Sequence, residues 1–345
     1  MIIVMEQNAT QKQMDNVVKY IQDRGMKSYI HKGDILNVVA VIGDKINLNA
    51  ESIAALDGVA SVNKIQEPYK LVSRSAHPED TIIEFSNGVK VGGNEKPVLM
   101  VGPCSVENDF NSLLEIAKAA KEMGCQFLRG GAFKPRTSPY DFQGLEEKGL
   151  KYLAKASKAT GLLVVTEVMD TADIDLICRY ADVLQVGARN MQNFKLLKAL
   201  GKINKPVMIK RGPAATIKEF LLAAEYVVSN GNENVILCER GIRSFDSQYS
   251  RNVLDIAAVP IIRKYSHLPI IVDPSHGTGK RYLIEPMGKA ALVAGANGLM
   301  YEIHNDPDNA MSDGAQSLNL DQFRQVTRSL NKLIGRIDYD NKNSK

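Results

Sequence analysis

The chain has 345 residues, which is long for a single domain and predicts two. Apolar residues make up 44% and charged residues 24%, and the net charge is only +4, so the composition is that of a globular protein and argues against a nucleic-acid binder. No run of about 18 apolar residues and no signal-peptide pattern occurs, so no membrane span or export is expected. The four cysteines are scattered without zinc-type pairing, which favours free thiols and a cytoplasmic location.

Residues 1–70 predict a small ferredoxin-like domain in which six elements follow the order βαββαβ. Thr10 is suited to cap the first helix and Gly25 to end it. His31, the only histidine in this region, is interpreted as a surface turn residue rather than a ligand. The expected strands are residues 2–5, 28–30, 35–42 and 59–65, and the expected helices are residues 10–24 and 50–56.

Residues 71–96 predict a linker followed by a β-hairpin. The pair Asn87-Gly88 lies between two short apolar runs, and this arrangement is typical of a two-residue hairpin turn. The hairpin is expected to lead into the second domain, residues 97–345.

From residue 97 the chain alternates continuous apolar runs with amphipathic stretches. Runs that are apolar throughout are typical of parallel strands covered on both faces, and stretches such as 149–160 and 217–229 have helical periodicity. Eight such units in roughly 250 residues predict an α/β fold, a (β/α)8 barrel. An open doubly wound sheet is the alternative, but no G-x-G-x-x-G sequence follows the first run. The eight runs begin at Val98, Gln126, Leu162, Val183, Pro206, Val235, Pro269 and Gly298.

Polar side chains gather directly after the apolar runs, where the active site of a (β/α)8 barrel lies. Cys104 follows the first run, His276 the seventh, and Glu302 and Asp313 the eighth. Barrel closure places the eighth strand beside the first, so these four side chains are expected to meet at one rim. A thiolate, an imidazole and two carboxylates are suitable ligands for a divalent transition ion. Taken singly, each has a simpler interpretation: a small apolar plug, a loop histidine and two solvated acids.

A second group of side chains at the same strand ends is cationic. Its members are Arg129, Lys134, Arg136, Arg189, Lys210 and Arg240. Converging cations in a barrel need partners, and arginine forks match the geometry of phosphate, so the group predicts one or more phosphorylated ligands. The alternative is that nearby acids neutralise the cations within the protein; the candidates are Glu146, Glu147, Glu167 and Glu239.

Five long motifs in the expected barrel match a known family. They are GPCSVEN (102–108), LRGGAFKPRTSPYDFQG (128–144), QVGARNMQNF (185–194), DPSHGTGK (273–280) and EIHNDPDNAMSDGAQSL (302–318). The chain thus resembles the 3-deoxy-7-phosphoheptulonate (DAHP) synthases, in their type I beta subgroup, over about residues 97–337. The resemblance implies a metal-dependent, aldol-like condensation of phosphoenolpyruvate with erythrose 4-phosphate.

The resemblance also assigns roles to individual side chains. It implies one divalent metal ion, such as Mn, Fe, Co or Zn, with the ligands Cys104, His276, Glu302 and Asp313. The residues implied to lie around phosphoenolpyruvate are Arg129, Lys134, Gly187, Ala188, Arg189, Lys210 and Arg240. Those implied to lie around erythrose 4-phosphate are Pro135, Arg136, Thr137, Ser138 and Asp273. Proton transfer and the positioning of water are left to Lys134, Asp273, His276 and Glu167, which the sequence does not rank.

The related 3-deoxy-octulosonate 8-phosphate synthases, which use arabinose 5-phosphate, are the first alternative. Their sugar loop reads K-A-N-R-S where this chain has Lys134-Pro135-Arg136-Thr137-Ser138, which favours the four-carbon sugar. A non-catalytic phosphosugar sensor is a further alternative, but no metal ligand or phosphate-binding cation of the family is missing.

For residues 1–70, the resemblance implies regulation. In this subgroup a ferredoxin-like domain confers feedback inhibition by tyrosine or phenylalanine, usually within a homotetramer. Neither a nucleic acid nor a membrane is expected as a partner.

Overall fold

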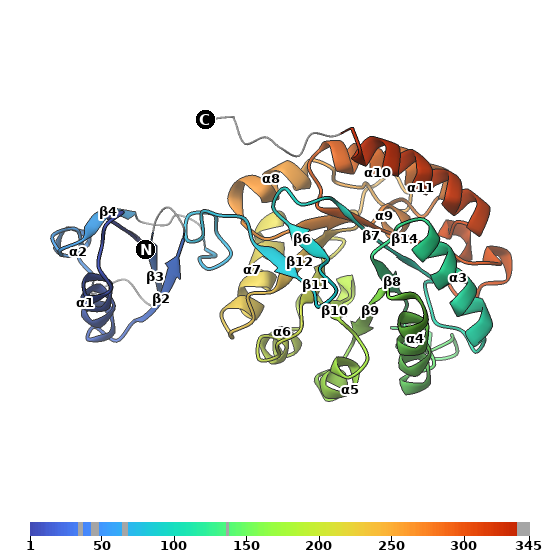
Figure 1. Ribbon diagram of the computed structural model, residues 1–345, viewed down its shortest axis with the longest axis horizontal. Helices are drawn as coiled ribbons and strands as arrows, with labels where there is room; N and C mark the ends of the chain where they lie inside the picture. The colour runs from blue at the N-terminus through green and yellow to red at the C-terminus, as the bar shows by residue number, and fades with distance from the viewer. Residues whose placement is uncertain (34–36, 43–47, 64–67, 136–137, 337–345) are drawn as a thin grey trace. The chain divides into compact units, whose positions relative to one another are not determined.

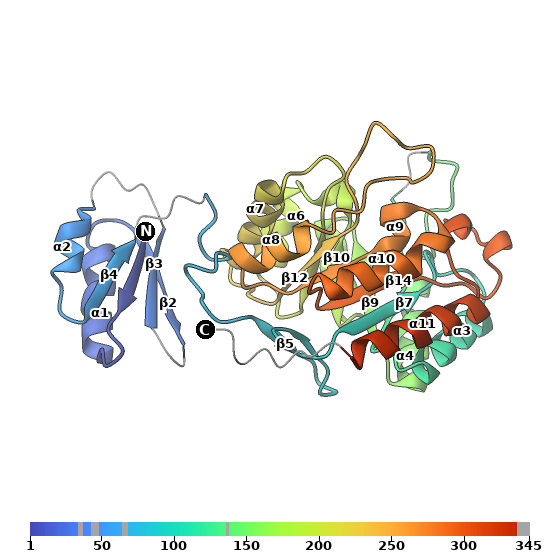
Figure 2. The same ribbon diagram turned by 90° about the horizontal axis from the view of Figure 1, so that it is seen from above.

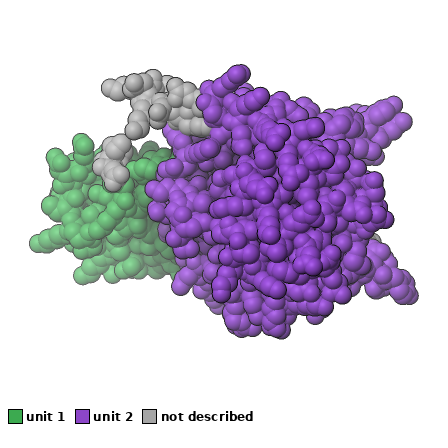
Figure 3. Space-filling view, turned by 45° about the vertical axis from the view of Figure 1, so that its right-hand side comes forward, with its two compact units in different colours: residues 1–80, 264–267 green, residues 81–263, 268–345 purple. Residues whose placement is uncertain are grey.

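The structure, a computed structural model, describes residues 1–33, 37–42, 48–63, 68–135 and 138–336. It divides into two compact units (Figure 3): unit 1 comprises residues 1–80 with 264–267, and unit 2 comprises residues 81–263 with 268–345. Residues 71–80, expected as a linker, lie in unit 1, and the expected hairpin lies in unit 2.

Unit 1 contains a four-stranded antiparallel sheet with two helices, and the predicted ferredoxin-like fold is confirmed. The strands lie side by side in the order β2-β3-β1-β4, so the first strand is central, with Ile2 opposite both Ala40 and Asn63. The elements are β1 (Ile2–Met5), α1 (Gln11–Gln22), β2 (Lys27–Lys32), β3 (Asn37–Ile42), α2 (Ala50–Ala54) and β4 (Val59–Asn63). Residues 35, 36, 64 and 65 of the expected strands lie outside the described residues.

Helix α1 forms where the sequence predicts it. Thr10 and Gln13 form a capping box, and the helix turns Val17 and Ile21 toward the apolar core of the sheet. The interpretation of His31 as a surface turn residue is wrong, because β2 extends beyond the short apolar run that predicted it and pairs His31 with Val38.

The hairpin of β5 (Ile82–Glu84) and β6 (Lys90–Gly92) belongs to the barrel unit. Phe85 and Val91 join the apolar cluster that fills the barrel interior, and the Phe85 ring meets Phe127 of β8 edge-on, with centroids 5.1 Å apart. The hairpin therefore covers the amino-terminal end of the barrel strands, away from the rim that bears the polar motifs.

Unit 2 is a closed barrel of eight parallel strands, as predicted, and the open-sheet alternative is excluded (Figure 1). Strand β14 pairs with β7 from Gly298–Val98 to Glu302–Gly102, which closes the barrel. The strands are β7 (Val98–Gly102), β8 (Phe127–Arg129), β9 (Leu163–Val168), β10 (Val183–Val186), β11 (Val207–Lys210), β12 (Val235–Glu239), β13 (Ile270–Val272) and β14 (Gly298–Glu302).

Helices surround the barrel, and α10, α11, α3 and α4 follow one another around its outside (Figure 2). Their apolar faces turn inward; in α11, for example, Phe323 and Leu330 are fully buried. The helices are α3 (Phe110–Glu122), α4 (Glu147–Thr160), α5 (Ile174–Cys178), α6 (Phe194–Leu200), α7 (Ile217–Val228), α8 (Ala258–Tyr265), α9 (Pro274–Thr278), α10 (Arg281–Val293) and α11 (Leu320–Ile334). Within the described ranges, no helix combines the length and the apolar character that crossing a membrane requires.

Candidate functional site

Four side chains of ligand type meet at the carboxyl-terminal rim of the barrel. Cys104 follows β7, His276 lies in α9 after β13, Glu302 ends β14, and Asp313 lies in the loop beyond β14. Because β13, β14 and β7 are neighbours, residues up to 209 positions apart come together. One ligand atom from each residue lies within 4.8 Å of the others, and we call this group the barrel cluster.

The distances within the barrel cluster suit one small cation. The Cys104 thiol donates to Asp313 Oδ2 at 3.0 Å, and His276 Nε2 lies 3.2 Å from Glu302 Oε1. Lys134 Nζ donates to the Cys104 sulfur at 3.0 Å. Sulfur, nitrogen and oxygen donors in this arrangement fit a divalent transition ion, and the mixed set does not select a single metal.

Further hydrogen bonds orient two members of the cluster. Asp273 Oδ2 lies 2.7 Å from His276 Nδ1, so Nδ1 carries the proton and Nε2 is turned toward Glu302. Gln316 Nε2 donates to Glu302 Oε2 at 2.6 Å, and Arg129 Nη1 donates to Oε1 at 2.9 Å. The imidazole and the carboxylate are therefore fixed by the protein itself.

The surrounding charges hold the carboxylates of the cluster ionised. Burial by itself raises the pKa of Glu302, but the charges of His276 and Arg129 hold this pKa below its usual value. Burial also raises the pKa of Asp313, yet the Cys104 hydrogen bond and the charge of His276 bring it to about 2. The thiol differs, since burial and the charge of Glu302 raise the pKa of Cys104 to about 12. A cation at the sulfur would favour the thiolate.

Asp313 has an unusual backbone. Its φ of +49° lies in the left-handed region, which only one other non-glycine residue, Glu146, adopts among the described residues. The next residue must be small, because a side chain on Gly314 would overlap the carbonyl oxygen of Pro307. Ser317 Oγ donates to the Asp313 carbonyl at 3.2 Å and holds the turn. Strained backbone of this kind concentrates at functional sites.

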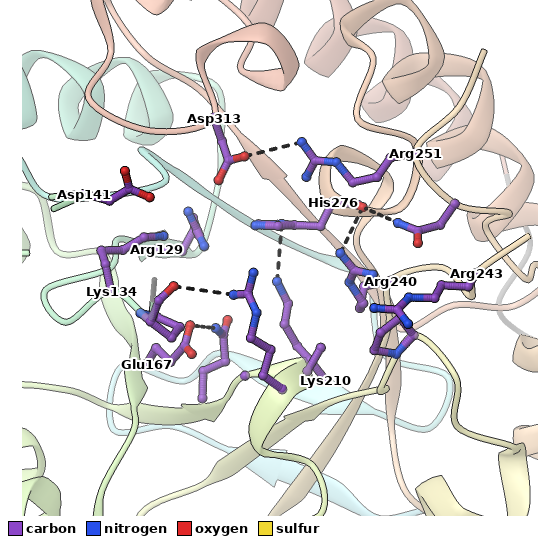
Figure 4. Close-up of a pocket in the computed structure, with 17 residues that line it drawn as sticks. Arg129, Lys134, Asp141, Glu167, Lys210, Arg240, Arg243, Arg251, His276 and Asp313 are labelled. Carbon is purple, nitrogen blue, oxygen red and sulfur yellow. Dashed lines mark hydrogen bonds and ion pairs between the residues drawn. The ribbon is translucent and has the colours of Figure 1, made fainter. Parts of the chain in front are cut away.

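A cavity of about 490 Å³ opens beside the barrel cluster (Figure 4). Figure 4 shows Arg129 and Lys134 on one side of it, and Arg240 and Arg243 on the other. Among the described residues, the lining acids are Asp141, Glu167 and Asp313, and the lining cations are Arg129, Lys134, Arg189, Lys210, Arg240, Arg243 and Arg251. The walls therefore carry an excess of positive charge.

The cations differ in their partners. Arg129 pairs with Glu302 at 2.9 Å, and Lys210 pairs with Asp273 at 2.5 Å. Within the described part of the chain, the polar contacts of Lys134, Arg189 and Arg240 are with a thiol and with backbone carbonyls, and none of the three forms an ion pair with a carboxylate. Cations that line a cavity without a carboxylate partner are suited to an anionic ligand.

The four glutamates considered as internal counter-charges make other contacts. Glu147 pairs with Lys151, and Glu239 pairs with Arg211. Glu146 is exposed at the start of α4. Glu167 lines the cavity and accepts a hydrogen bond from Gln185 at 3.3 Å.

The segment Gly187-Ala188 lies in the wall of the cavity, at the end of β10. A side chain on Gly187 would overlap Glu167 Oε1, so only glycine allows the carboxylate to lie against this backbone. Ala188 begins a short 3-10 turn that runs to Asn190 and contains Arg189. The motif of residues 185–194 thus places backbone, a cation and an acid at one point of the wall.

The sugar-loop residues are only partly described. Pro135 lines the cavity, and Arg136 and Thr137 lie outside the described residues. The Ser138 hydroxyl is half-buried and accepts a hydrogen bond from the Tyr140 backbone at 3.2 Å.

Asp273 lies beneath the cavity rather than in its wall. Its carboxylate is fully buried, and it contacts both Lys210 and His276. Burial by itself raises the pKa of Asp273, but the charges of His276 and Lys210 hold it well below its usual value. An ionised Asp273 can position both Lys210 and His276.

Sequence reasoning missed several residues of the wall. Arg243, Arg251 and Asn252 lie in the long segment after β12, and Asp141 lies in the loop after β8. Arg251 also reaches the barrel cluster, since its Nη2 lies 3.4 Å from Asp313 Oδ1. These residues also follow a barrel strand, as the predicted site residues do. They lie several positions beyond the strand end, so the sequence pattern did not single them out.

Two sequence families together match nearly the whole chain. The pattern of the DAHP synthetase I family matches residues 80–338, and that of the DAHP synthase ferredoxin-like domain matches residues 1–67. Among individual proteins, the phospho-2-dehydro-3-deoxyheptonate aldolase of Thermotoga maritima is 49% identical over 96% of this chain and 97% of its own length. The 2-dehydro-3-deoxyphosphooctonate aldolase of Syntrophotalea carbinolica is 32% identical over 70% of this chain and 92% of its own length.

Solved structures agree. The crystal structure of the Thermotoga maritima phospho-2-dehydro-3-deoxyheptonate aldolase (DAHP synthase) superposes with a TM-score of 0.76 and 48% identity, and the match covers 97% of each chain. A truncated form of 3-deoxy-D-arabino-heptulosonate 7-phosphate synthase from the same organism has a TM-score of 0.71, and the match covers 77% of this chain and 96% of that one. With its barrel, its cavity and both matching patterns, this chain belongs to the DAHP synthetase I family.

Proposed function

We propose that this chain condenses phosphoenolpyruvate with erythrose 4-phosphate and water to give DAHP and inorganic phosphate, the first step of the shikimate pathway to aromatic amino acids. The observation that carries the proposal is the strongly cationic cavity beside the barrel cluster. Two phosphorylated substrates, each phosphate bearing a charge of about −1.5 to −2, would balance the excess of cations.

Cys104, His276, Glu302 and Asp313 would hold one divalent ion, such as Mn, Fe, Co or Zn. Their donor set and their mutual spacing within 4.8 Å support this role, and so does the orientation of His276 by Asp273. When bound, such an ion supplies Lewis-acid polarisation of the sugar aldehyde.

Five cations and one stretch of backbone would hold phosphoenolpyruvate; they are Arg129, Lys134, Arg189, Lys210, Arg240 and Gly187-Ala188. Cations in a water-poor cavity bind a carboxylate and a phosphate strongly, because the dielectric there is low. The absence of ion pairs at Lys134, Arg189 and Arg240 within the described residues supports the assignment.

Erythrose 4-phosphate would lie against Pro135, Arg136, Thr137 and Ser138, with Arg243 and Arg251 on the far wall. Asp273 would act on the sugar through its neighbours, because its carboxylate is fully buried. In this arrangement the aldehyde end faces the barrel cluster and the phosphate end faces the outer wall.

The reaction forms one carbon–carbon bond, adds the oxygen of water at C2 and breaks the bond between C2 and the phosphate oxygen. C3 of phosphoenolpyruvate attacks the aldehyde carbon, and Lys134, which lines the cavity, gives a proton to the new alkoxide. Water positioned by Glu167 adds at C2 and leaves its proton on Glu167. The C2 hydroxyl then gives its proton to the departing phosphate as the bond between C2 and the phosphate oxygen breaks, so C2 becomes a ketone and inorganic phosphate leaves. Return of the proton from Glu167 to Lys134 restores both side chains.

The loss of phosphoenolpyruvate absorbance with Mn²⁺ and each sugar tests this function. Erythrose 4-phosphate should be turned over far faster than arabinose 5-phosphate, and Arg136→Ala should raise the KM for the sugar more than that for phosphoenolpyruvate. A preference for arabinose 5-phosphate would assign the chain to the octulosonate reaction instead. No turnover with either sugar would leave a binding protein, although the barrel cluster and the cavity are both complete.

Unit 1 would regulate the barrel by binding tyrosine or phenylalanine, within a homotetramer. The match of residues 1–67 to the DAHP synthase ferredoxin-like domain supports this role. Deletion of residues 1–70 should keep activity and remove inhibition, and ultracentrifugation measures the oligomeric state. The four free cysteines support a cytoplasmic location.

A further inference from the structure

Unit 1 contains a second group of ligand-type side chains, which shares no residue with the barrel cluster. His31, His77 and Glu79 each place one ligand atom within 4.8 Å of the other two. We call these three residues the histidine cluster. They line no part of the cationic cavity, and the proposed reaction uses none of them.

The histidine cluster joins two segments of unit 1. His31 lies near the end of β2, and His77 and Glu79 lie on either side of Pro78 in the segment after the turn at Ser73. His31 Nε2 lies 2.9 Å from Glu79 Oε2, so the two side chains are already within hydrogen-bonding distance.

His77 is oriented as a metal-binding histidine would be. Its Nδ1 lies 2.7 Å from the backbone oxygen of Glu79. A carbonyl only accepts hydrogen bonds, so Nδ1 carries the proton and Nε2 is the ring nitrogen of the type that binds a metal. Metal-binding histidines characteristically donate their second ring nitrogen to a carbonyl or a carboxylate in this way.

Ring stacking holds the two imidazoles in place. The centroids of His31 and His77 are 3.6 Å apart, and His267 stacks on His77 with centroids 4.1 Å apart and an interplanar angle of 19°. His267 Nε2 donates to the Leu71 carbonyl at 2.8 Å, so this nitrogen is not a ligand. His267 therefore orients His77 and adds no donor to the cluster.

We propose that His31, His77 and Glu79 form a second binding site for a divalent transition ion of the zinc type, which ties β2 to the segment of residues 77–79. Two imidazoles and one carboxylate are a known three-residue set for zinc, and water completes the tetrahedron. The side chains of His31 and Glu79 are 27% and 34% exposed, so solvent reaches the site to supply that water. This inference does not depend on the proposed reaction.

The full-length chain, stripped with a chelator and titrated with Co²⁺, tests the proposal, because cobalt reports its ligands in its spectrum. Equilibrium dialysis should give two ions per chain. Of the two clusters, only the barrel cluster contains a cysteine, which a bound cation turns into a thiolate, so only one of the two ions should give a thiolate-to-cobalt charge-transfer band. In Cys104→Ala the band should vanish while one ion remains bound.

Glu79→Gln keeps the shape of the side chain and removes its charge. It should lower the affinity for the second ion by at least about 100-fold, the upper end of the loss that follows removal of a supporting contact. The charge-transfer band should stay unchanged. Glu84→Gln is the matched control, because Glu84 forms an exposed pair with Lys90 and pairs with no histidine among the described residues. Its two ions should remain. One ion in the wild type, or two tightly bound ions in Glu79→Gln, would overturn the proposal. Unchanged hydrogen exchange of β2 and β3 in the chelator-treated variant shows that its unit 1 is folded.

Discussion

The barrel cluster and the histidine cluster use similar side chains in different surroundings. The Glu302 side chain is 0% exposed and that of Glu79 is 34% exposed. The Glu302 carboxylate accepts hydrogen bonds from Arg129 and Gln316, and the Glu302 backbone N–H donates to the Ser275 hydroxyl. The Glu79 carboxylate, by contrast, is partly exposed to solvent. The buried carboxylate of the barrel cluster thus has hydrogen-bond partners from the protein in place of water.

This difference separates two ways of building an ion site. A buried carboxylate without its partners is strongly destabilising, so the barrel cluster needs its network of hydrogen bonds whether or not an ion is bound. A half-exposed carboxylate keeps water as a partner, so the histidine cluster needs no such network. Substitutions should therefore be severe in the first cluster and mild in the second.

The largest effect is expected for Glu302→Ala. This change leaves Arg129 buried without its ion-pair partner, and breaking a buried pair costs about 3–5 kcal/mol. The urea midpoint of unit 2 should fall accordingly, and activity should be lost. Glu84→Ala, which breaks the exposed pair with Lys90 at 3.7 Å, is the control and should change stability by less than about 1 kcal/mol. If the two variants had equal urea midpoints, the proposed difference in stability between a buried and an exposed ion pair would be wrong.

The barrel cluster was predictable from the sequence for a topological reason. In a (β/α)8 barrel every strand end lies on one rim, so Cys104, His276 and Glu302 could be placed together without knowledge of any side-chain contact. Which side chains pair with one another was not predictable. That Arg129 pairs with Glu302, and that Asp273 lies beneath the cavity, depend on side-chain directions within the rim.

The histidine cluster was missed because no repeating pattern relates its parts. His31 lies in a strand whose apolar run is short, and His77 lies in what the sequence predicts as a linker. His267 comes 190 positions after His77, two residues beyond the end of α8. Three of the five histidines of the chain meet there, but only the folded chain brings them together.

A smaller effect is expected for Gln316→Ala, which removes a supporting contact and no ligand. Its amide donates to Glu302 Oε2 at 2.6 Å. The loss of such a partner lowers metal affinity by about 10–100-fold, which the cobalt charge-transfer band of the barrel cluster measures. Gln11→Ala, on the surface of unit 1, is the control. Unchanged cobalt affinity in Gln316→Ala would mean that the network serves the fold and not the ion.

The pH dependence of stability should sharpen the comparison. Burial and the nearby charges of His77, Arg74 and His31 lower the pKa of His267 to about 3, although its contact with Leu71 opposes the shift. His267 therefore takes up a proton below about pH 6.5 in the unfolded chain but only below about pH 3 in the folded chain. The free energy of unfolding is greatest above pH 6.5 and decreases as the pH falls from about 6.5 to about 3.

Each pH unit in this window costs about 1.4 kcal/mol, or about 2 kcal/mol at pH 5. Hydrogen exchange of the unit 1 amides in chelator-treated protein measures the loss. His267→Gln lacks the ring stacking on His77, so at pH 8 it should be less stable than the wild type. Its stability should fall less steeply than that of the wild type between pH 8 and pH 5. The same slope in both proteins would place the acid sensitivity elsewhere.

The smallest effect is expected for His31→Gln without any ion. The side chain is 27% exposed and its pair with Glu79 is open to water, so the change should cost less than about 1 kcal/mol in chelator-treated protein. With Zn²⁺ at about 100 times its Kd, the wild type should gain about 2.7 kcal/mol in unit 1 and His31→Gln should gain none. Hydrogen exchange of β2 and β3 measures both quantities. A loss of about 3 kcal/mol in the ion-free variant would mean that the histidine cluster, like the barrel cluster, is a buried network on which the fold depends.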